Sequence, residues 1–133
     1  MKSITIKYLK SFEQLKPSTI SILVDCLHES FIFIDPFNKI EGKENFRKFL
    51  EKIFLKIKNP KFKILNVLED KNLSLVKWSF EYRKSQKKIS FNGTSELLIK
   101  KNLICKHIDY WDSGKNFYSN LPLIGSIFRK IHY

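Results

Sequence analysis

The apolar residues of this chain change their spacing about halfway along it, and this change restricts the possible folds more than any other feature. Over most of the first half they recur at the three- and four-residue intervals that are typical of helices. Four strand-like runs follow, at 62–69, 73–82, 89–99 and 103–111. This pattern predicts an α+β domain with helices on one face of a curved antiparallel sheet, leaving a cavity between the layers. Gly93, inside a strand, is a candidate β-bulge for that curvature.

The first half is expected to hold three helices and one strand. Helical spacing covers residues 4–15 and 20–27, and the run FIFID at 31–35 has the character of a short strand. A third helix follows Gly42 and ends before Asn59. The predicted order is therefore helix, helix, strand, helix and four strands.

The length of 133 residues predicts a single domain over 1–133. A hydrophobic fraction of 43% is enough for a core and excludes a disordered chain. Residues 112–133 form an apolar C-terminal extension beyond the sheet. Three ways to bury it remain open: as a lid over the pocket mouth, against a dimer partner, or on an anionic membrane surface.

The charge of the chain is strongly basic, with 25 Lys and Arg against 13 Asp and Glu, a net charge of +12. Such a balance ordinarily indicates a polyanionic partner. Only three of these residues are Arg, the side chain that binds phosphate in a bidentate way, and many of the lysines fall at expected hairpin tips. The chain also contains no Ala, as a biased base composition would produce. We therefore expect no specific nucleic-acid partner.

The cysteines and histidines fit no known spacing for a disulfide framework or a metal site. Cys26 and Cys105 are far apart, and His28 and His132 make no metal-ligand spacing with His107. No stretch resembles a secretory signal or a membrane span. The chain is therefore predicted to be cytoplasmic, with reduced thiols, no membrane span, no metal and no other cofactor.

The last strand-like run carries the first candidate site. Because side chains alternate across a sheet, His107, Asp109 and Trp111 share one face. An imidazole beside a carboxylate is suited to general acid/base chemistry. A His–Asp pair on a solvated strand face is the alternative, but the neighbouring indole favours a pocket wall.

Asp35 is the second candidate, because it shares a strand face with Phe31 and Phe33. A carboxylate with apolar walls has a raised pKa and becomes a usable base near neutral pH. The alternative is structural, since an Asp before Pro36 commonly starts a turn and accepts hydrogen bonds from backbone amides.

The string FIDPFNKIEG at 33–42, an aromatic-rich helix, and strands that end in HIDYWD at 107–112 resemble the nuclear transport factor 2-like superfamily, in its SnoaL-like and ketosteroid-isomerase branch. The resemblance implies a cone-shaped α+β roll around one apolar pocket, usually in a homodimer. It places Asp35 where the isomerases keep a proton-shuttling Asp. Asp109 falls where SnoaL-like cyclases use an acidic residue, and Trp111 falls at a pocket aromatic.

Some positions depart from the family. The isomerases hold a protonated Asp on the strand before the last, where this chain has NGTSELLI at 92–99. The pocket Tyr of their first helix corresponds to Tyr8 or to Phe12, which lacks a hydroxyl. No Asp–Arg–Asp set of the limonene-epoxide-hydrolase type is evident. Steroid isomerisation is therefore not the expected activity.

Two functions remain open. The first is acid/base catalysis of an isomerase, cyclase or hydrolase type on a small apolar substrate, with Asp35, His107 and Asp109 as catalytic residues. The second is a non-catalytic ligand-binding or dimeric interaction module with the same fold. In both, the predicted pocket wall consists of Tyr8, Phe12, Phe33, Phe37, Trp78 and Trp111. The alternation of Trp78, Phe80 and Tyr82 fits either the core or that wall.

Overall fold

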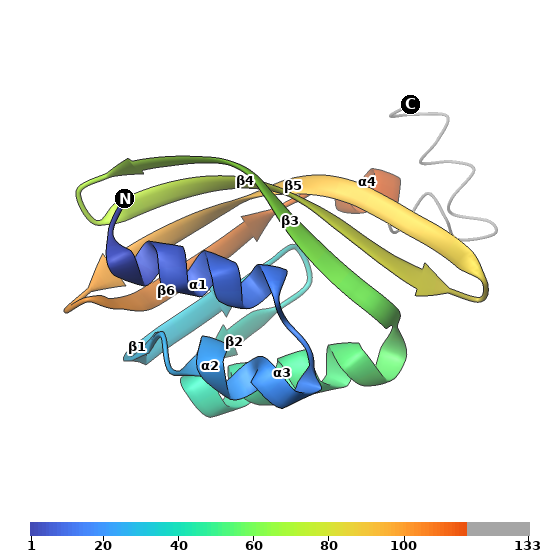
Figure 1. Cartoon of the computed structure of the whole chain (residues 1–133), viewed down its shortest axis with the longest axis horizontal. Coiled ribbons are helices and arrows are strands. Elements are labelled where there is room, and N and C mark those ends of the chain that lie inside the picture. Colours follow the sequence, from blue (N-terminus) through green and yellow to red (C-terminus); the bar gives the residue numbers. More distant parts are fainter. Residues whose placement is uncertain (117–133) are drawn as a thin grey trace.

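A six-stranded sheet forms one layer of the molecule, and three helices lie against its concave face (Figure 1). The computed structural model describes residues 1–116, and the predicted extension beyond residue 116 lies outside that range. The elements are α1 (Ser3–Glu13), the 3-10 turn η1 (Pro17–Thr19), α2 (Ile20–Val24), β1 (Leu27–Ile34), β2 (Lys39–Glu41), α3 (Lys43–Lys56), β3 (Lys58–Asp70), β4 (Leu73–Lys84), β5 (Lys87–Lys100), β6 (Leu103–Tyr110) and α4 (Ser113–Asn116).

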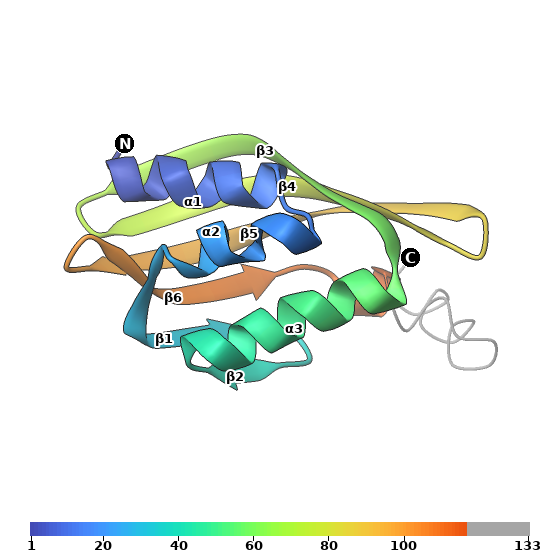
Figure 2. The same cartoon turned by 60° about the horizontal axis from the view of Figure 1, so that its bottom comes forward.

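The strand order across the sheet is β2-β1-β6-β5-β4-β3. The three hairpins from β3 to β6 are antiparallel, as predicted, whereas β1 pairs with β6 in parallel. The turned view in Figure 2 shows α1, α2 and α3 on the same side of this sheet. The predicted α+β architecture and element order are therefore confirmed.

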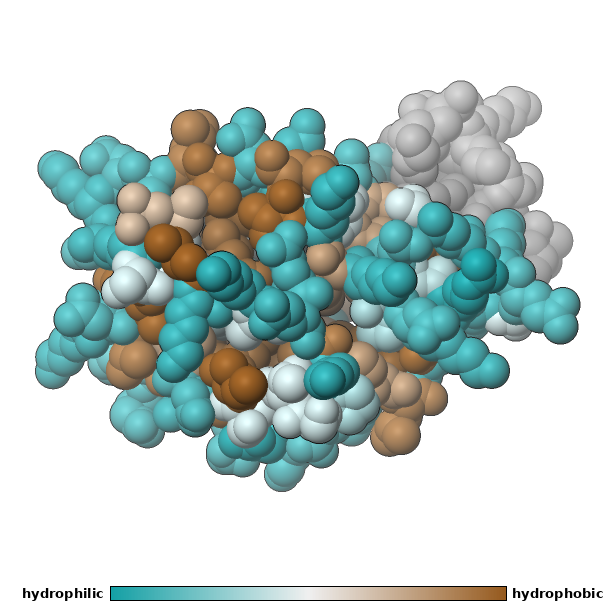
Figure 3. Space-filling model, in the orientation of Figure 1, coloured by the Kyte–Doolittle hydropathy of each residue, from teal (hydrophilic) through white to brown (hydrophobic). Residues whose placement is uncertain are grey.

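The helices are held by one apolar stripe each. In α1 the stripe contains Tyr8, Leu9 and Phe12, and in α3 it contains Phe46 and Leu50 at an interval of four residues. Because residues at that interval share a helix face, each helix buries one side against the sheet and leaves the other in solvent. Hydrophilic side chains are spread over the visible face of the molecule rather than gathered in one patch (Figure 3).

Two predictions for the first half were wrong in detail. The helix expected over 20–27 ends at Val24, and Leu27 instead opens β1 by pairing with Ile104 of β6. A short apolar run fits either period, and here the tertiary pairing decides. The structure also has strand β2, which was not predicted because three residues give too little pattern to recognise.

The predicted bulge at Gly93 is also wrong. Gly93 pairs with Trp78 in an uninterrupted ladder between β4 and β5, whereas the register shifts lie in β3 and near Leu98 and Ile99. A Cβ atom at Gly93 would overlap the six-membered ring of Trp78. Gly93 is therefore the place where the strand makes room for an indole.

The carboxylate of Glu69, near the end of β3, ties the start of α1 to the sheet. It accepts hydrogen bonds from the backbone N–H of Lys2 at 2.6 Å and from the hydroxyls of Thr5 and Ser74, each at 2.5 Å. Partial burial alone would raise the pKa of Glu69, but these three hydrogen bonds outweigh it and lower the pKa. The fold thus fixes the register of α1 over the strands that carry the site.

None of the helices within residues 1–116 combines the length and apolar character that crossing a membrane requires.

Candidate functional site

Five side chains form a continuous hydrogen-bonded chain between α1 and the concave face of the sheet. Tyr8 Oη lies 2.7 Å from His107 Nδ1, and His107 Nε2 lies 2.6 Å from Asp109 Oδ1. Ser95 Oγ donates to the same Oδ1 at 2.5 Å and accepts from Trp78 Nε1 at 2.8 Å. We call these five side chains the polar chain.

Strand register brings these residues together. Ser95 lies directly opposite Asp109 on the neighbouring strand, and Leu97 lies opposite His107. Since residues two apart on a strand share a face, His107, Asp109 and Ser95 all project toward the helices. Tyr8 enters from α1, whose position over the sheet completes the chain.

The directions of the hydrogen bonds follow from the donors. An indole N–H only donates, so Ser95 Oγ accepts from Trp78 and turns its own proton toward Asp109. Burial, and next the negative charge of Asp109, raise the pKa of Tyr8 well above its usual value, so its phenol keeps its proton. The Asp109 carboxylate only accepts, so the imidazole proton lies on Nε2, and the Tyr8 hydroxyl donates to Nδ1 of His107. Both ends of the polar chain therefore donate toward Asp109.

The imidazole sits in an apolar cage. His107 is 5% exposed, and its ring lies edge-on to those of Tyr8, Phe12 and Phe33, at centroid distances of 5.7, 5.6 and 5.2 Å. This packing leaves the ring one orientation. Within residues 1–116, the hydrogen bonds that the Asp109 carboxylate accepts all end on Oδ1, which leaves Oδ2 for another partner.

A small internal cavity adjoins the polar chain. Its volume is about 20 Å³, enough for roughly one water molecule. Its lining residues come from α1 and from four strands: Leu9, Phe12, Phe62, Ile64, Val76, Trp78, Ser95, Leu97, His107 and Asp109. The site is therefore nearly filled by the protein's own side chains in this conformation.

Phe62 belongs both to this cavity and to a depression on the surface. Its ring lines the internal cavity and also an open depression of about 620 Å³ beside the end of α1. It stacks on Phe80 at a centroid distance of 4.5 Å and meets Phe12 edge-on at 5.3 Å. Phe62 is the residue that lines both spaces.

Asp35 lies in the turn between β1 and β2 and takes no part in the polar chain. Its Oδ1 accepts the backbone N–H groups of Phe37 at 2.8 Å and Asn38 at 2.6 Å, and the Asn38 side-chain amide also bonds to the carboxylate. This is the turn arrangement that the sequence analysis gave as the alternative. The structure thus brings His107 and Asp109 together and leaves Asp35 outside their network.

The predicted pocket wall divides in the same way. Phe12 and Trp78 line the cavity, while Tyr8 and Phe33 contact the His107 ring. Phe37 and Trp111 instead pair with each other at a centroid distance of 5.5 Å, and they do not line the cavity. Trp78 fits both of its interpretations, since it is 5% exposed and also lines the cavity.

Two members of the site were not among the predicted site residues. Ser95 lies in the stretch 92–99 that corresponds to the strand of the isomerases' protonated Asp, and it shares a strand face with the buried Leu97 and Ile99. Phe62 lies in a strand of alternating burial whose register shifts nearby, so its role at the cavity wall depends on tertiary packing.

Neither cysteine belongs to the polar chain. Burial raises the pKa of the Cys26 thiol, and neither Cys26 nor Cys105 is in a disulfide. Within the part of the chain that the structure describes, no three His, Cys, Asp or Glu side chains are grouped to hold a metal ion.

A curved six-stranded sheet with helices on one face, and with polar groups on that face, defines the class of this domain as an α+β roll. The SnoaL-like domain family matches residues 9–107, so the chain belongs to that family. The predicted resemblance to the SnoaL-like branch is thereby confirmed. No curated protein matches the sequence.

Solved structures share the fold at low sequence identity. A Catenulispora acidiphila protein with a ketosteroid isomerase-like fold has a TM-score of 0.75 at 10% identity, covering 90% of this chain and 92% of its own. An M. tuberculosis LEH-like epoxide hydrolase has a TM-score of 0.72 at 14% identity, with coverages of 86% and 84%. A Sinorhizobium meliloti protein described as a polyketide cyclase has a TM-score of 0.69 at 13% identity, covering 83% of this chain and 95% of its own. At these identities the likeness establishes the fold alone.

Proposed function

We propose that this protein is an acid/base catalyst for a small apolar carbonyl compound, with Asp109 as the residue that accepts and returns a proton. The observation that supports this most is the asymmetric bonding of Asp109. His107 and Ser95 both donate to Oδ1, while Oδ2 is left for a ligand beside a cavity. A carboxylate that is oriented by two donors, with its second oxygen available, is the arrangement a general base needs.

The polar chain is compatible with both halves of a proton transfer. When Oδ2 takes a proton from carbon, Oδ1 remains an acceptor, so the bonds from His107 and Ser95 persist. The carboxyl can then return the proton to a neighbouring carbon without rearranging the network. This favours isomerisation or enol-dependent cyclisation over reactions that need a separate nucleophile.

The cavity of about 20 Å³ holds no organic substrate, so substrate binding requires it to widen, and we propose that the Phe62 ring moves to allow this. The depression outside Phe62 offers an approach route. Asp35, the second carboxylate of the original hypothesis, would contribute only after releasing the amides of its turn. We therefore assign the proton transfer to Asp109, and we assign to His107 the role of holding the Asp109 carboxylate in position.

The expected result of Asp109→Asn is a loss of proton exchange of roughly 10²- to 10⁴-fold, the usual contribution of a general base. Deuterium incorporation at the α-carbons of cyclohexanone and 2-cyclohexen-1-one in D2O, followed by NMR, measures it. Asp70→Asn is the matched control, because it makes the same change from carboxylate to carboxamide at an exposed position at the end of β3. This variant should retain the wild-type rate. Full exchange by Asp109→Asn would exclude Asp109 as the base.

The alternative function is a non-catalytic binding or interaction module, and the outer face of the sheet supports it. On the outer face of the sheet, strand register aligns Leu68, Leu75, Ile108 and Ile34 in one row, interrupted by Glu96. Leu68 is 70% exposed and Leu75 is 42% exposed, which is unusual for a strand surface with no partner. We propose that this row is the contact of a homodimer.

Sedimentation equilibrium of the full chain tests the homodimer. The wild type is expected to sediment as a dimer and Leu75→Glu as a monomer, because a carboxylate would be buried in the apolar contact. Leu55→Glu, at the exposed Leu55 on α3, is the control and should remain dimeric. A monomeric wild type would contradict the proposal.

A cytoplasmic location also remains a proposal. It is supported by two cysteines that form no disulfide, and cell fractionation would check it.

A further inference from the structure

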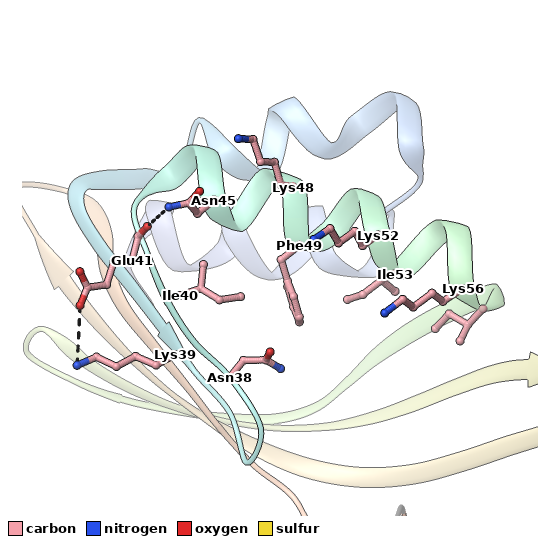
Figure 4. A pocket seen from close by; sticks show the side chains of 11 residues that line it. Asn38, Lys39, Ile40, Glu41, Asn45, Lys48, Phe49, Lys52, Ile53 and Lys56 are labelled. Atoms are coloured by element: carbon pink, nitrogen blue, oxygen red, sulfur yellow. Dashed lines mark hydrogen bonds and ion pairs between the residues drawn. The ribbon is translucent and has the colours of Figure 1, made fainter.

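A second hollow lies outside the polar chain, between strand β2 and helix α3 (Figure 4). Its volume is about 670 Å³, within the range of small-molecule sites, and it shares no lining residue with the internal cavity. The residues that line it are Asn38, Lys39, Ile40, Glu41, Asn45, Lys48, Phe49, Lys52, Ile53, Lys56 and Ile57. We call it the β2–α3 groove.

The groove has an apolar interior. In Figure 4 the side chains of Ile40, Phe49 and Ile53 point into the space between the strand and the helix. All three are half-buried, so each presents apolar surface that the protein's own side chains leave partly uncovered. A ligand with an apolar body would cover that surface and gain the free energy of removing it from water.

The rim of the groove is cationic. It carries four lysines and one carboxylate, and that carboxylate, Glu41, already pairs with Lys39 at 3.8 Å. Lys48, Lys52 and Lys56 follow one another at intervals of four residues, so they lie along one side of α3 about 6 Å apart. None of the three forms an ion pair with any residue in the range 1–116. The ammonium groups of Lys52 and Lys56 lie beside the apolar side chains in Figure 4.

We propose that the β2–α3 groove binds an amphipathic anion, with its apolar body against Ile40, Phe49 and Ile53 and its acidic head at Lys52 and Lys56. The argument is charge complementarity combined with an apolar floor. A hydrophilic anion would leave the floor exposed, and a neutral apolar compound would leave the lysines without a counter-charge. A nucleic acid is less well matched, because the lining has one aromatic side chain and no Arg.

Decanoate below its critical micelle concentration is the probe, measured by isothermal titration with the full-length protein. Decanoate is expected to bind at least about tenfold more tightly than 1-decanol, which lacks the charge, and than butyrate, which lacks the tail. Decyltrimethylammonium should not bind in the groove. Equal binding of decanoate and 1-decanol would overturn the proposal, because the lysines would then contribute nothing.

The matched variants separate the groove from the general charge of the protein. Lys52→Glu combined with Lys56→Glu is expected to lower decanoate affinity about tenfold or more. Lys84→Glu combined with Lys87→Glu makes the same charge change at the exposed tip of the β4–β5 hairpin and should change it less than about twofold. Equal losses in the two pairs would reduce the effect to net charge and overturn the proposal.

Two further outcomes distinguish other ligands. Asp109→Asn should leave decanoate affinity unchanged, so a loss there would move the binding to the internal cavity and overturn the groove assignment. Binding of inorganic phosphate or an oligothymidylate that depends on Lys52 and Lys56, without decanoate binding, would identify a simple anion or nucleic-acid patch and would also overturn it. Failure of the Asp109 exchange assay bears on the polar chain alone.

Discussion

Gly93→Ala is expected to destabilise the protein by about 2–3 kcal/mol, because the added methyl group would overlap the Trp78 ring. The ring is held in place by its neighbours. Its indole N–H is bonded to Ser95, and the ring packs edge-on to Phe62 and Phe91 at centroid distances of 6.0 and 6.2 Å. Moving Trp78 would break the bond that orients the Ser95 hydroxyl toward Asp109.

Urea unfolding measures the free-energy change, and near-ultraviolet circular dichroism reports the displacement of the indole. Asn92→Ala is the matched control, since Asn92 precedes Gly93 on β5 but is exposed on the opposite face. That variant should change the free energy of unfolding by less than about 0.5 kcal/mol. Equal stabilities of the two variants would contradict the close approach of Trp78 to the β5 backbone. Alanine is more favourable than glycine in a strand, so backbone propensity alone predicts that Gly93→Ala stabilises the protein.

The fold was predictable wherever a segment was long enough to show its period. Helix α3 carries five buried or partly buried apolar residues at helical spacing, and β3, β4 and β5 each contain a stretch of alternating burial. Where the pattern was short, pairing decided the structure. Leu27 satisfies a helical stripe and a strand equally well, and it joins β1 because Ile104 of β6 lies beside it. Strand β2 exists because the turn at Asp35 returns the chain along β1.

Within the polar chain, strand alternation specifies only the pair that lies on β6, whereas Tyr8 entered the predicted pocket wall through the family resemblance. Alternation alone places His107 and Asp109 on one face, because both belong to β6. Tyr8 is 99 residues away from His107, and no local pattern indicates that α1 would deliver a phenol to the imidazole. For Asp35 the strand alternation was misleading. It predicted a carboxylate that points toward the core, but the carboxylate instead accepts hydrogen bonds from the backbone N–H groups of Phe37 and Asn38.

The basic charge has a similar lesson. The lysines cannot be told apart in the sequence, but in the structure they differ in the side chains that surround them. Lys43 and Lys88 pair with Glu29 and Glu81, whereas Lys52 lies beside an apolar floor. Which lysines have a specific use therefore depends on tertiary packing rather than on composition.

His107→Ala is expected to have the largest effect on stability, a loss of about 3–5 kcal/mol. The substitution removes a ring from an apolar cage and leaves the fully buried hydroxyl of Tyr8 without its acceptor. It also removes one of the two donors to Asp109 Oδ1. Cavity formation and an unsatisfied buried hydroxyl act together at one position, which is why the cost exceeds that of an ordinary core truncation.

Added imidazole should restore much of what His107→Ala loses, because the vacated space has the shape of that ring and offers a donor on one side and an acceptor on the other. The melting temperature of the variant is expected to rise with imidazole concentration, as ligand binding to the folded state requires. Pyrrole, which has the size of imidazole but no acceptor nitrogen for Tyr8, should rescue less. His28→Ala, at a half-buried imidazole that bonds to Ser30, is the control and should gain nothing from imidazole. Equal rescue by pyrrole and imidazole would show that the cage recognises shape alone and would contradict a contribution of the Tyr8 to His107 hydrogen bond to stability.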